Sequence, residues 1–192
     1  MTQQQKQYIE QNIDLIENNR WEEFFEPAPV GLGSVLYEAG IDFMTKMRKI
    51  PDWVFFGSNI EDMAIPDGVT TVGYAAFAGC KNLTSIIIPE SVTSIGYEAF
   101  SHCTSLTSIN IPESVTSISS LAFFYCTSLK SITIPNNVNS IEEGAFADLG
   151  SDVIINFNGT KEQWKNIYNS KAFTNTYFIV NCLDGTIHKK KR

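Results

Sequence analysis

The chain has 192 residues, of which 43% are hydrophobic and 18% charged, and its 14 basic and 21 acidic side chains give a net charge of −7. This length and composition fit one folded domain with a substantial core and exclude an intrinsically disordered chain. The acidic balance argues against nucleic acid as the main ligand.

Residues 1–50 predict a helical N-terminal cap. Apolar residues share one helical face over 3–17 and again over 34–47, where Gly40 and Asp42 mark a stop and a new start. Pro27 and Pro29 separate the two patterns, and Trp21, Phe24 and Phe25 are expected to pack the helices together. The helices either cover the first strand edge of the following unit or form a separate partner-binding module.

Residues 51–158 contain a sequence repeat in which the same residue types return at every twenty-third position. Each unit carries Ile-Pro, a valine three positions later, Ala-Phe, a cysteine, a leucine and an isoleucine. The repeated phenylalanines are Phe77, Phe100, Phe123 and Phe146, the cysteines are Cys80, Cys103 and Cys126, and the leucines are Leu83, Leu106 and Leu129.

One repeat unit predicts a strand over 83–88, a second short strand over 92–95 and a single helical turn over 98–103. Pro89 ends the first strand because it has no amide hydrogen for a ladder bond, and Gly96 turns the chain. No unit can bury its apolar side alone, so the units are expected to stack as coils of a solenoid. Its core would consist of the columns that contain Val69, Val72, Phe77, Leu83, Ile86 and Ile88.

This repeat resembles the 23-residue type of the leucine-rich repeat superfamily found in BspA-like bacterial surface proteins. The resemblance implies a leucine-rich repeat solenoid of β-strands plus short helical turns, with a helical cap before it and a helix-plus-strand cap after it. The resemblance weakens at both ends of the repeat region. Upstream, Val54, Gly57, Ile60, Met63 and Ile65 take the places of Phe77, Cys80, Leu83, Ile86 and Ile88, and downstream Leu149, Asp152, Phe157 and Asn158 replace the consensus residues.

Residues 159–187 predict a C-terminal cap. Thr160 and Gln163 form the capping box of a helix through Tyr168, whose Trp164 and Ile167 would face the last coil. A closing strand over 177–182, in which Cys182 is expected to be buried, precedes an Asp184-Gly185 turn. Residues 188–192 form a basic tail, which we interpret as a solubilising segment.

Side chains that could support catalysis or metal binding are sparse. The three repeated cysteines are expected to be buried thiols, because their spacing lacks the close pairs of structural zinc sites. Of the two histidines, His102 is expected to face solvent and His188 lies in the basic tail. No nucleophile, base and orienting group can be assembled, and no glycine-rich phosphate loop is present. We therefore expect no enzymatic activity, metal or cofactor.

A partner-binding surface is predicted from the outward columns of the repeat and from side chains that depart from the consensus. In leucine-rich repeats the strand face is the commonest recognition surface, and the resemblance carries that role to Thr84, Ser85, Thr107, Ser108, Asn110, Lys130, Thr133 and Asn156. The departures from the consensus are Ile87, Phe124 and Tyr125, together with Tyr74 and Tyr97, which share a column with Ser120.

The expected function is non-catalytic binding of a protein partner through the solenoid surface. Two alternatives are a BspA-like surface adhesin and an inhibitor of a host protein encoded by a phage or mobile element. No secretory stretch or membrane span is recognised, so the expected location is the cytoplasm, with neither membrane nor nucleic acid as a partner.

Overall fold

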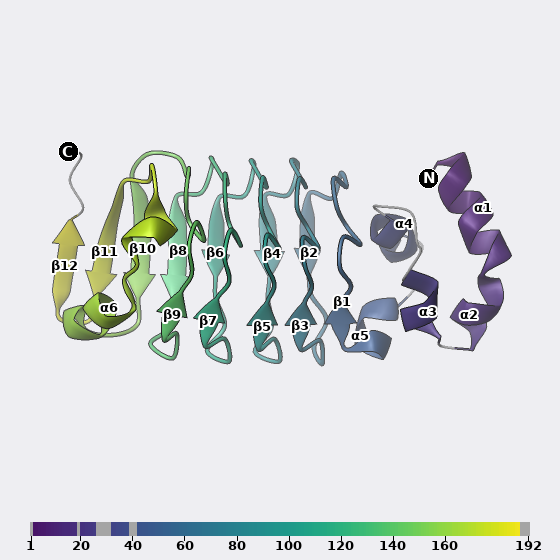
Figure 1. Ribbon diagram of the computed structural model, residues 1–192, viewed down its shortest axis with the longest axis horizontal. Helices are drawn as coiled ribbons and strands as arrows, with labels where there is room; N and C mark the ends of the chain where they lie inside the picture. The colour runs from purple at the N-terminus through teal and green to yellow at the C-terminus, as the bar shows by residue number, and fades with distance from the viewer. Residues whose placement is uncertain (1, 19, 26–31, 39–41, 189–192) are drawn as a thin grey trace.

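The computed structural model describes residues 2–18, 20–25, 32–38 and 42–188, and shows an elongated stack of coils with helices at its N-terminal end (Figure 1). Each coil has a strand on one side, a shorter strand on another side and a segment of turns between them. The first side contains β2 (Asp62–Ala64), β4 (Ser85–Ile87), β6 (Ser108–Asn110), β8 (Ser131–Ile134), β10 (Val153–Phe157), β11 (Phe178–Cys182) and β12 (Gly185–His188). The second contains β1 (Lys49–Ile50), β3 (Thr71–Val72), β5 (Ser94–Ile95), β7 (Ser117–Ile118) and β9 (Ser140–Ile141).

Successive repeats pair in parallel and in register, as the sequence repeat predicts. Ser85 lies beside Asp62, Ser131 beside Ser108, and Ser94 beside Thr71. Identical positions therefore come to lie one above another along the whole stack. The predicted leucine-rich repeat solenoid is confirmed.

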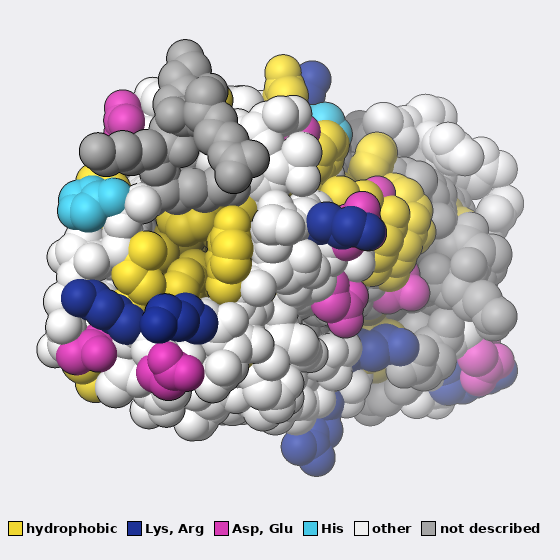
Figure 2. All heavy atoms as spheres, turned by 60° about the vertical axis from the view of Figure 1, so that its left-hand side comes forward, with side chains coloured by type: hydrophobic (Ala, Val, Ile, Leu, Met, Phe, Trp, Pro, Cys, Tyr) yellow, Lys and Arg dark blue, Asp and Glu magenta, His cyan; other side chains and the backbone are white. Residues whose placement is uncertain are grey.

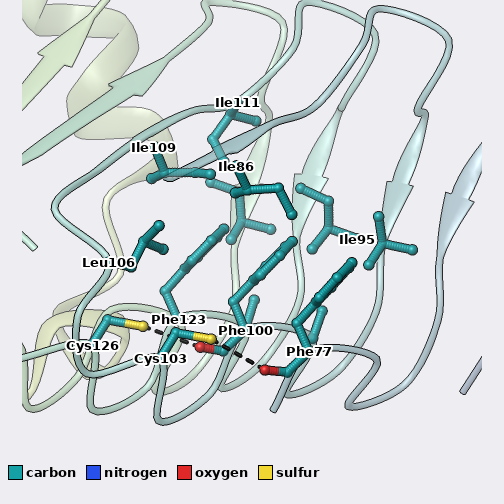
Figure 3. Close-up of a cluster of buried hydrophobic side chains, with 14 of the residues drawn as sticks. Phe77, Ile86, Ile95, Phe100, Cys103, Leu106, Ile109, Ile111, Phe123 and Cys126 are labelled. Carbon is teal, nitrogen blue, oxygen red and sulfur yellow. Dashed lines mark hydrogen bonds between the residues drawn. The ribbon is translucent and has the colours of Figure 1, made fainter. Parts of the chain in front are cut away.

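The repeated phenylalanines form a continuous ladder through the interior (Figure 3). Phe77, Phe100, Phe123 and Phe146 are fully buried, and neighbouring rings lie 5.2 or 5.3 Å apart and within 5° of parallel. The valine and leucine columns are also buried, whereas Ile88 is only partly buried. The core predicted from the repeat is thus confirmed, apart from this weaker position.

The segment between the short strand and the next long strand consists of successive turns closed by bonds three residues apart. Its amides also bond to the next coil: Phe77 N–H donates to Ala99 O and Phe100 N–H to Ala122 O, both at 2.8 Å. Two positions per coil have a left-handed backbone, and the residues that occupy them are mostly not glycine. The first column is Trp53, Ala75, Glu98, Leu121 and Gly144, and the second is Gly57, Gly79, His102, Tyr125, Asp148 and Asn175.

Gly79→Ala is expected to lower the free energy of unfolding by about 1 kcal/mol, because an L-residue with a side chain is strained at φ +72°. The added Cβ would meet no atom closer than 3.7 Å, so the cost comes from the backbone alone. Urea denaturation measures this loss in the free energy of unfolding. Gly79→Asn is the matched control and should cost less, since Asn175 occupies the same column at φ 55°. Equal stability of all three chains would contradict the strain argument.

The N-terminal helices lie at the end of the solenoid that begins with the first coil (Figure 1). They are α1 (Gln3–Gln11), α2 (Ile13–Glu17), α3 (Trp21–Phe25), α4 (Leu32–Glu38) and α5 (Phe43–Met47). Asp42 caps α5 by accepting the Thr45 amide at 3.1 Å, as predicted. Phe43 extends the interior ladder, because its ring lies 6.1 Å from that of Phe55 and 6.3 Å from that of Trp21. Gly40, Pro27 and Pro29 lie outside the described residues, as does the side chain of Phe25.

The first coil has a different register from the one expected. Phe55, not Val54, continues the ladder, since its ring stacks on Phe77 at 4.9 Å and 4°. Ser58, not Gly57, takes the cysteine position, with its hydroxyl 3.3 Å from the Cys80 sulfur. Strand β2 nevertheless pairs with β4 in the regular register, with Asp62 beside Ser85. One residue is therefore missing between Ser58 and Asp62, which no fixed period could reveal.

At the C-terminal end the coil geometry continues beyond β10. After α6 (Lys161–Ile167), with its capping box on Thr160, a 3₁₀ helix (Ser170–Phe173) places Phe173 on Phe146 at 5.3 Å. Strand β11 then pairs in parallel with β10, and β12 closes the sheet as an antiparallel hairpin. Trp164 is buried as predicted, but Cys182 is only partly buried. Lys189 to Arg192 lie outside the described residues.

None of the helices in the described part of the chain is long and apolar enough to cross a membrane.

Candidate functional site

The strand face brings together most of the predicted partner-binding residues. Ser85 and Ile87 point outward from β4, Ser108 and Asn110 from β6, and Thr133 from β8, while Asn156 lies on β10. Thr84, Thr107 and Lys130 precede these strands in one column. The face is thus formed by the expected residues.

The threonines of this face are largely engaged in the fold itself. The Thr84 hydroxyl donates to Glu61 O at 3.0 Å, and the Thr107 hydroxyl donates to Thr84 O at 3.3 Å. Thr93 makes the same contact to the preceding coil on the other sheet, at 3.2 Å. These hydroxyl groups therefore reinforce the stacking of coils, and they offer a ligand fewer donors than their exposure indicates.

Ile87 is the more exposed of two outward-facing isoleucines on the strand face, the other being Ile154 on β10. Its side chain is 67% exposed, the register places it beside Ala64, and Asn110 holds the same position in the next repeat. A single exposed isoleucine among small polar side chains is common on protein surfaces. By itself it gives weak support to a recognition role.

A stronger feature lies on the turn side of the solenoid, where four exposed aromatic rings form a continuous group. Tyr74 and Tyr97 stack at 5.4 Å and 4°, Trp53 lies 4.8 Å from Tyr74, and Phe56 lies 5.0 Å from Trp53. All four side chains are 37–40% exposed. We call Trp53, Phe56, Tyr74 and Tyr97 the aromatic strip.

The solenoid geometry explains why these rings line up. Tyr74 and Tyr97 occupy the same position of consecutive coils, directly after a glycine whose amide bonds to the preceding coil. The Tyr74 amide donates to the carboxylate of Asp52 at 2.8 Å, which fixes the start of the turn segment. The backbone that holds the rings is therefore part of the interior hydrogen-bond ladder, so the strip is rigid at its base.

Sequence reasoning identified only half of the strip. Tyr74 and Tyr97 stand out because they share a column with Ser120, but Trp53 and Phe56 belong to the first coil, whose register differs by one residue. A period shorter by one residue in that coil, signalled by the pair Phe55 and Phe77, would have placed both residues beside the tyrosines.

Phe124 and Tyr125 form a second exposed group at the other end of the turn segments. The ring of His102 lies 5.3 Å from that of Phe124 and 5.0 Å from that of Tyr125. Tyr125 and His102 are exposed, as predicted for His102, whereas Phe124 is half-buried. This group is smaller than the aromatic strip and carries an imidazole instead of carboxylates.

Acidic side chains surround the aromatic strip. Its column starts with Asp52 and ends, after Ser120, with Glu143, while Glu142 accepts hydrogen bonds from the Ser120 amide at 2.9 Å and hydroxyl at 3.1 Å. Partial burial, and secondly the charge of neighbouring Glu98, raise the pKa of the Tyr97 hydroxyl. The carboxylates of Asp52 and Glu98 are thus the acidic groups placed beside the rings, whereas Glu143 lies 4.0 Å from the Lys171 ammonium.

The cysteines form a buried column, as predicted. The thiols of Cys80, Cys103 and Cys126 donate to the carbonyl oxygens of Phe55, Phe77 and Phe100 at 2.9, 3.2 and 3.1 Å. Figure 3 shows the bonds of Cys103 and Cys126. Burial raises the pKa of Cys126 to about 12 and raises that of Cys103 well above the ordinary value. Protonated, inaccessible thiols are poor metal ligands and nucleophiles. Among the described residues, no three His, Cys, Asp or Glu side chains form a group that could hold a metal ion.

The model of the family described as BspA type leucine rich repeat region matches residues 48–179 in six copies. A leucine rich repeat protein of T. pallidum is 28% identical, with a TM-score of 0.52 over 68% of this chain and 66% of that one. The pneumococcal vaccine antigen PcpA is 22% identical, with a TM-score of 0.55 over 71% and 40%, a likeness of fold alone.

A leucine rich cell surface protein from Faecalibacterium prausnitzii is 29% identical, with a TM-score of 0.48 over 57% of this chain and 35% of that one. The chain therefore spans from about a third to just under two thirds of the length of these three proteins. No curated protein matches it.

Proposed function

Because this chain belongs to the BspA-type leucine-rich repeat family, we propose that it is a non-catalytic scaffold that binds a protein partner, with the aromatic strip as its main contact. One observation carries this proposal. The strip exposes four adjacent aromatic rings on a rigid support, although a solenoid coil needs none of them for its core.

Aromatic side chains are the commonest energetic centres of protein interfaces, because they bury a large area and lose little conformational entropy. The strip also lies along the solenoid axis, so a partner could contact several coils at once. The hydroxyl-rich strand face, whose threonines bond to neighbouring coils, is the secondary candidate.

The test uses the repeat itself to design the variant. Tyr74→Ser combined with Tyr97→Ser places in two coils the serine that occupies this column as Ser120. The immobilised full chain should capture a partner from a lysate of its source cell. The double variant should reduce that capture about tenfold or more, as loss of a centre of binding energy does, while its melting temperature changes little because both side chains are exposed.

Ile87→Asn is the matched control on the strand face, since Asn110 holds the equivalent position in the next repeat. It should leave capture unchanged. Loss of capture with Ile87→Asn and not with the tyrosine variant would move the contact to the strand face. Equal capture by all three chains would reject a role for either surface.

A further inference from the structure

The aromatic strip combines two properties that favour one class of ligand. The carboxylate of Asp52 accepts the Tyr74 amide at 2.8 Å, and the charge of Glu98 acts on the neighbouring Tyr97 hydroxyl. Figure 2 shows hydrophobic side chains gathered next to charged ones of both signs on the surface of the solenoid. The rings of the strip therefore form an apolar surface beside which two carboxylates, those of Asp52 and Glu98, are placed.

Aromatic ring faces attract cations, because the π-electron cloud places negative charge above and below the ring. Trp is the strongest of the three aromatic residues in this respect, and Arg, whose guanidinium stacks flat on a ring, is its most frequent partner. Carboxylates beside the rings, here Asp52 and Glu98, add direct attraction for the same cation. The negative charge of these carboxylates disfavours binding of a polyanion.

The shape of the strip favours an extended ligand over a compact ion. The rings of Trp53, Tyr74 and Tyr97 follow one another along the solenoid at steps of 4.8 and 5.4 Å. In an extended polypeptide, side chains on one face recur about every 6.7 Å. Two cationic side chains at alternate residues, about 6.7 Å apart, would therefore each find a ring within this row.

We propose that the aromatic strip binds an extended segment of the partner protein that carries arginine or lysine at alternate positions. This inference rests on the proposed function, because it names the chemistry of the segment that the scaffold would hold. Asp52 and Glu98 supply the charge, and the rings supply the stacking surface.

The strip contains its own reporter. Trp53 is 38% exposed, whereas the other tryptophans, Trp21 and Trp164, are buried at 5% and 3%. A short peptide with arginine at alternate positions should therefore produce a saturable change in tryptophan fluorescence of the full chain. Raising the salt concentration should weaken the binding, since screening reduces the attraction. Peptides with glutamate or glutamine in place of arginine are the comparison probes and should not bind.

The variants separate the contributions of rings and charge. Tyr74→Ser with Tyr97→Ser should weaken arginine-peptide binding about tenfold through the loss of two cation–π contacts, and Glu98→Gln should weaken it about threefold. Ile87→Asn should leave it unchanged. Equal binding of the glutamate peptide, or unchanged affinity in the double tyrosine variant, would overturn the proposal.

Two further experimental outcomes would reject the cationic segment as the ligand of the strip. If no peptide binds while partner capture still depends on Tyr74 and Tyr97, the scaffold function stands and the cationic segment is rejected. If sedimentation shows that the free chain self-associates, and the double tyrosine variant does not, the occupant is a second copy of the chain and the proposal is overturned.

Discussion

Replacing Phe100 with alanine is expected to lower the free energy of unfolding by about 3–5 kcal/mol, the range for truncation of a buried aromatic side chain. Phe100 is fully buried and lies between two parallel rings, 5.2 Å from Phe77 and 5.3 Å from Phe123. The cavity cannot close easily, because the backbone of each coil is held at a fixed distance by ladder bonds such as that from Phe100 N–H to Ala122 O.

Urea denaturation followed by circular dichroism measures this loss. Tyr97→Ser, three residues away on the same coil, is the matched control, because it also removes a ring but from the exposed strip. It should cost well under half as much. A loss below about 1 kcal/mol for Phe100→Ala would show that the phenylalanine ladder contributes little to stability.

The fixed period of the repeat was sufficient to predict the central coils, for a physical reason. In-register stacking places each residue on its equivalent in the next coil, so a column that is apolar in the sequence, such as that of Phe77, has to become an interior ladder. The outward columns follow from the same geometry. The strand-face candidates, from Thr84 to Asn156, therefore appeared together on one surface as predicted.

The ends of the solenoid were harder to predict, because there the spacing changes while the geometry does not. Phe173 stacks on Phe146 although the chain between them is longer than one repeat, since α6 replaces the short strand of that coil and lengthens it. Thr176 then takes the cysteine position, and its hydroxyl donates to Phe146 O at 2.7 Å. A fixed period of 23 residues predicts the place of neither Phe173 nor Thr176, although Ala172-Phe173 repeats the Ala-Phe pair.

For a related reason, the left-handed positions could not be deduced from the sequence, and the complete aromatic strip could not be deduced from a fixed period of 23 residues. Glu98 and His102 adopt positive φ angles because the hydrogen bonds between coils fix the backbone. The presence of a glutamate or a histidine does not by itself predict that conformation. Trp53 and Phe56 join the strip only after the shorter first coil is placed correctly. In both cases tertiary contacts determine a feature of the structure that the local sequence pattern does not specify.

Raising the pH above about 9 is expected to destabilise the protein through its buried thiols. Burial raises the pKa of Cys126 from the ordinary 9.0 to about 12, an effect only partly offset by the Cys103 backbone amide. Burial, with smaller contributions from the neighbouring thiols, likewise raises the pKa of Cys103. In the unfolded chain the same groups ionise near their ordinary value, so above it unfolding releases protons.

The direction of the effect follows from linkage. The stabilisation is fully present below pH 9, where folded and unfolded chains both keep the thiols protonated, and it is lost progressively as the pH rises toward 12. Each such thiol lowers the free energy of unfolding by about 1.4 kcal/mol per pH unit in this window. Urea denaturation at a series of pH values from neutral upward measures the slope.

Cys103→Thr and Cys126→Thr are the matched variants, because Thr176 already fills this position in the last coil and donates to the equivalent carbonyl oxygen. A threonine hydroxyl keeps the donor but does not ionise in this range. The double variant should lose about 2 kcal/mol less than the natural chain when the pH is raised by one unit above 9, because the unfolded thiols are half ionised at pH 9 and almost fully ionised at pH 10. Tyrosines and lysines ionise equally in both chains, so the difference isolates the thiols. Identical slopes for the natural chain and the double variant would mean that the thiols ionise while the chain stays folded. The buried position of these thiols between stacked coils does not permit this.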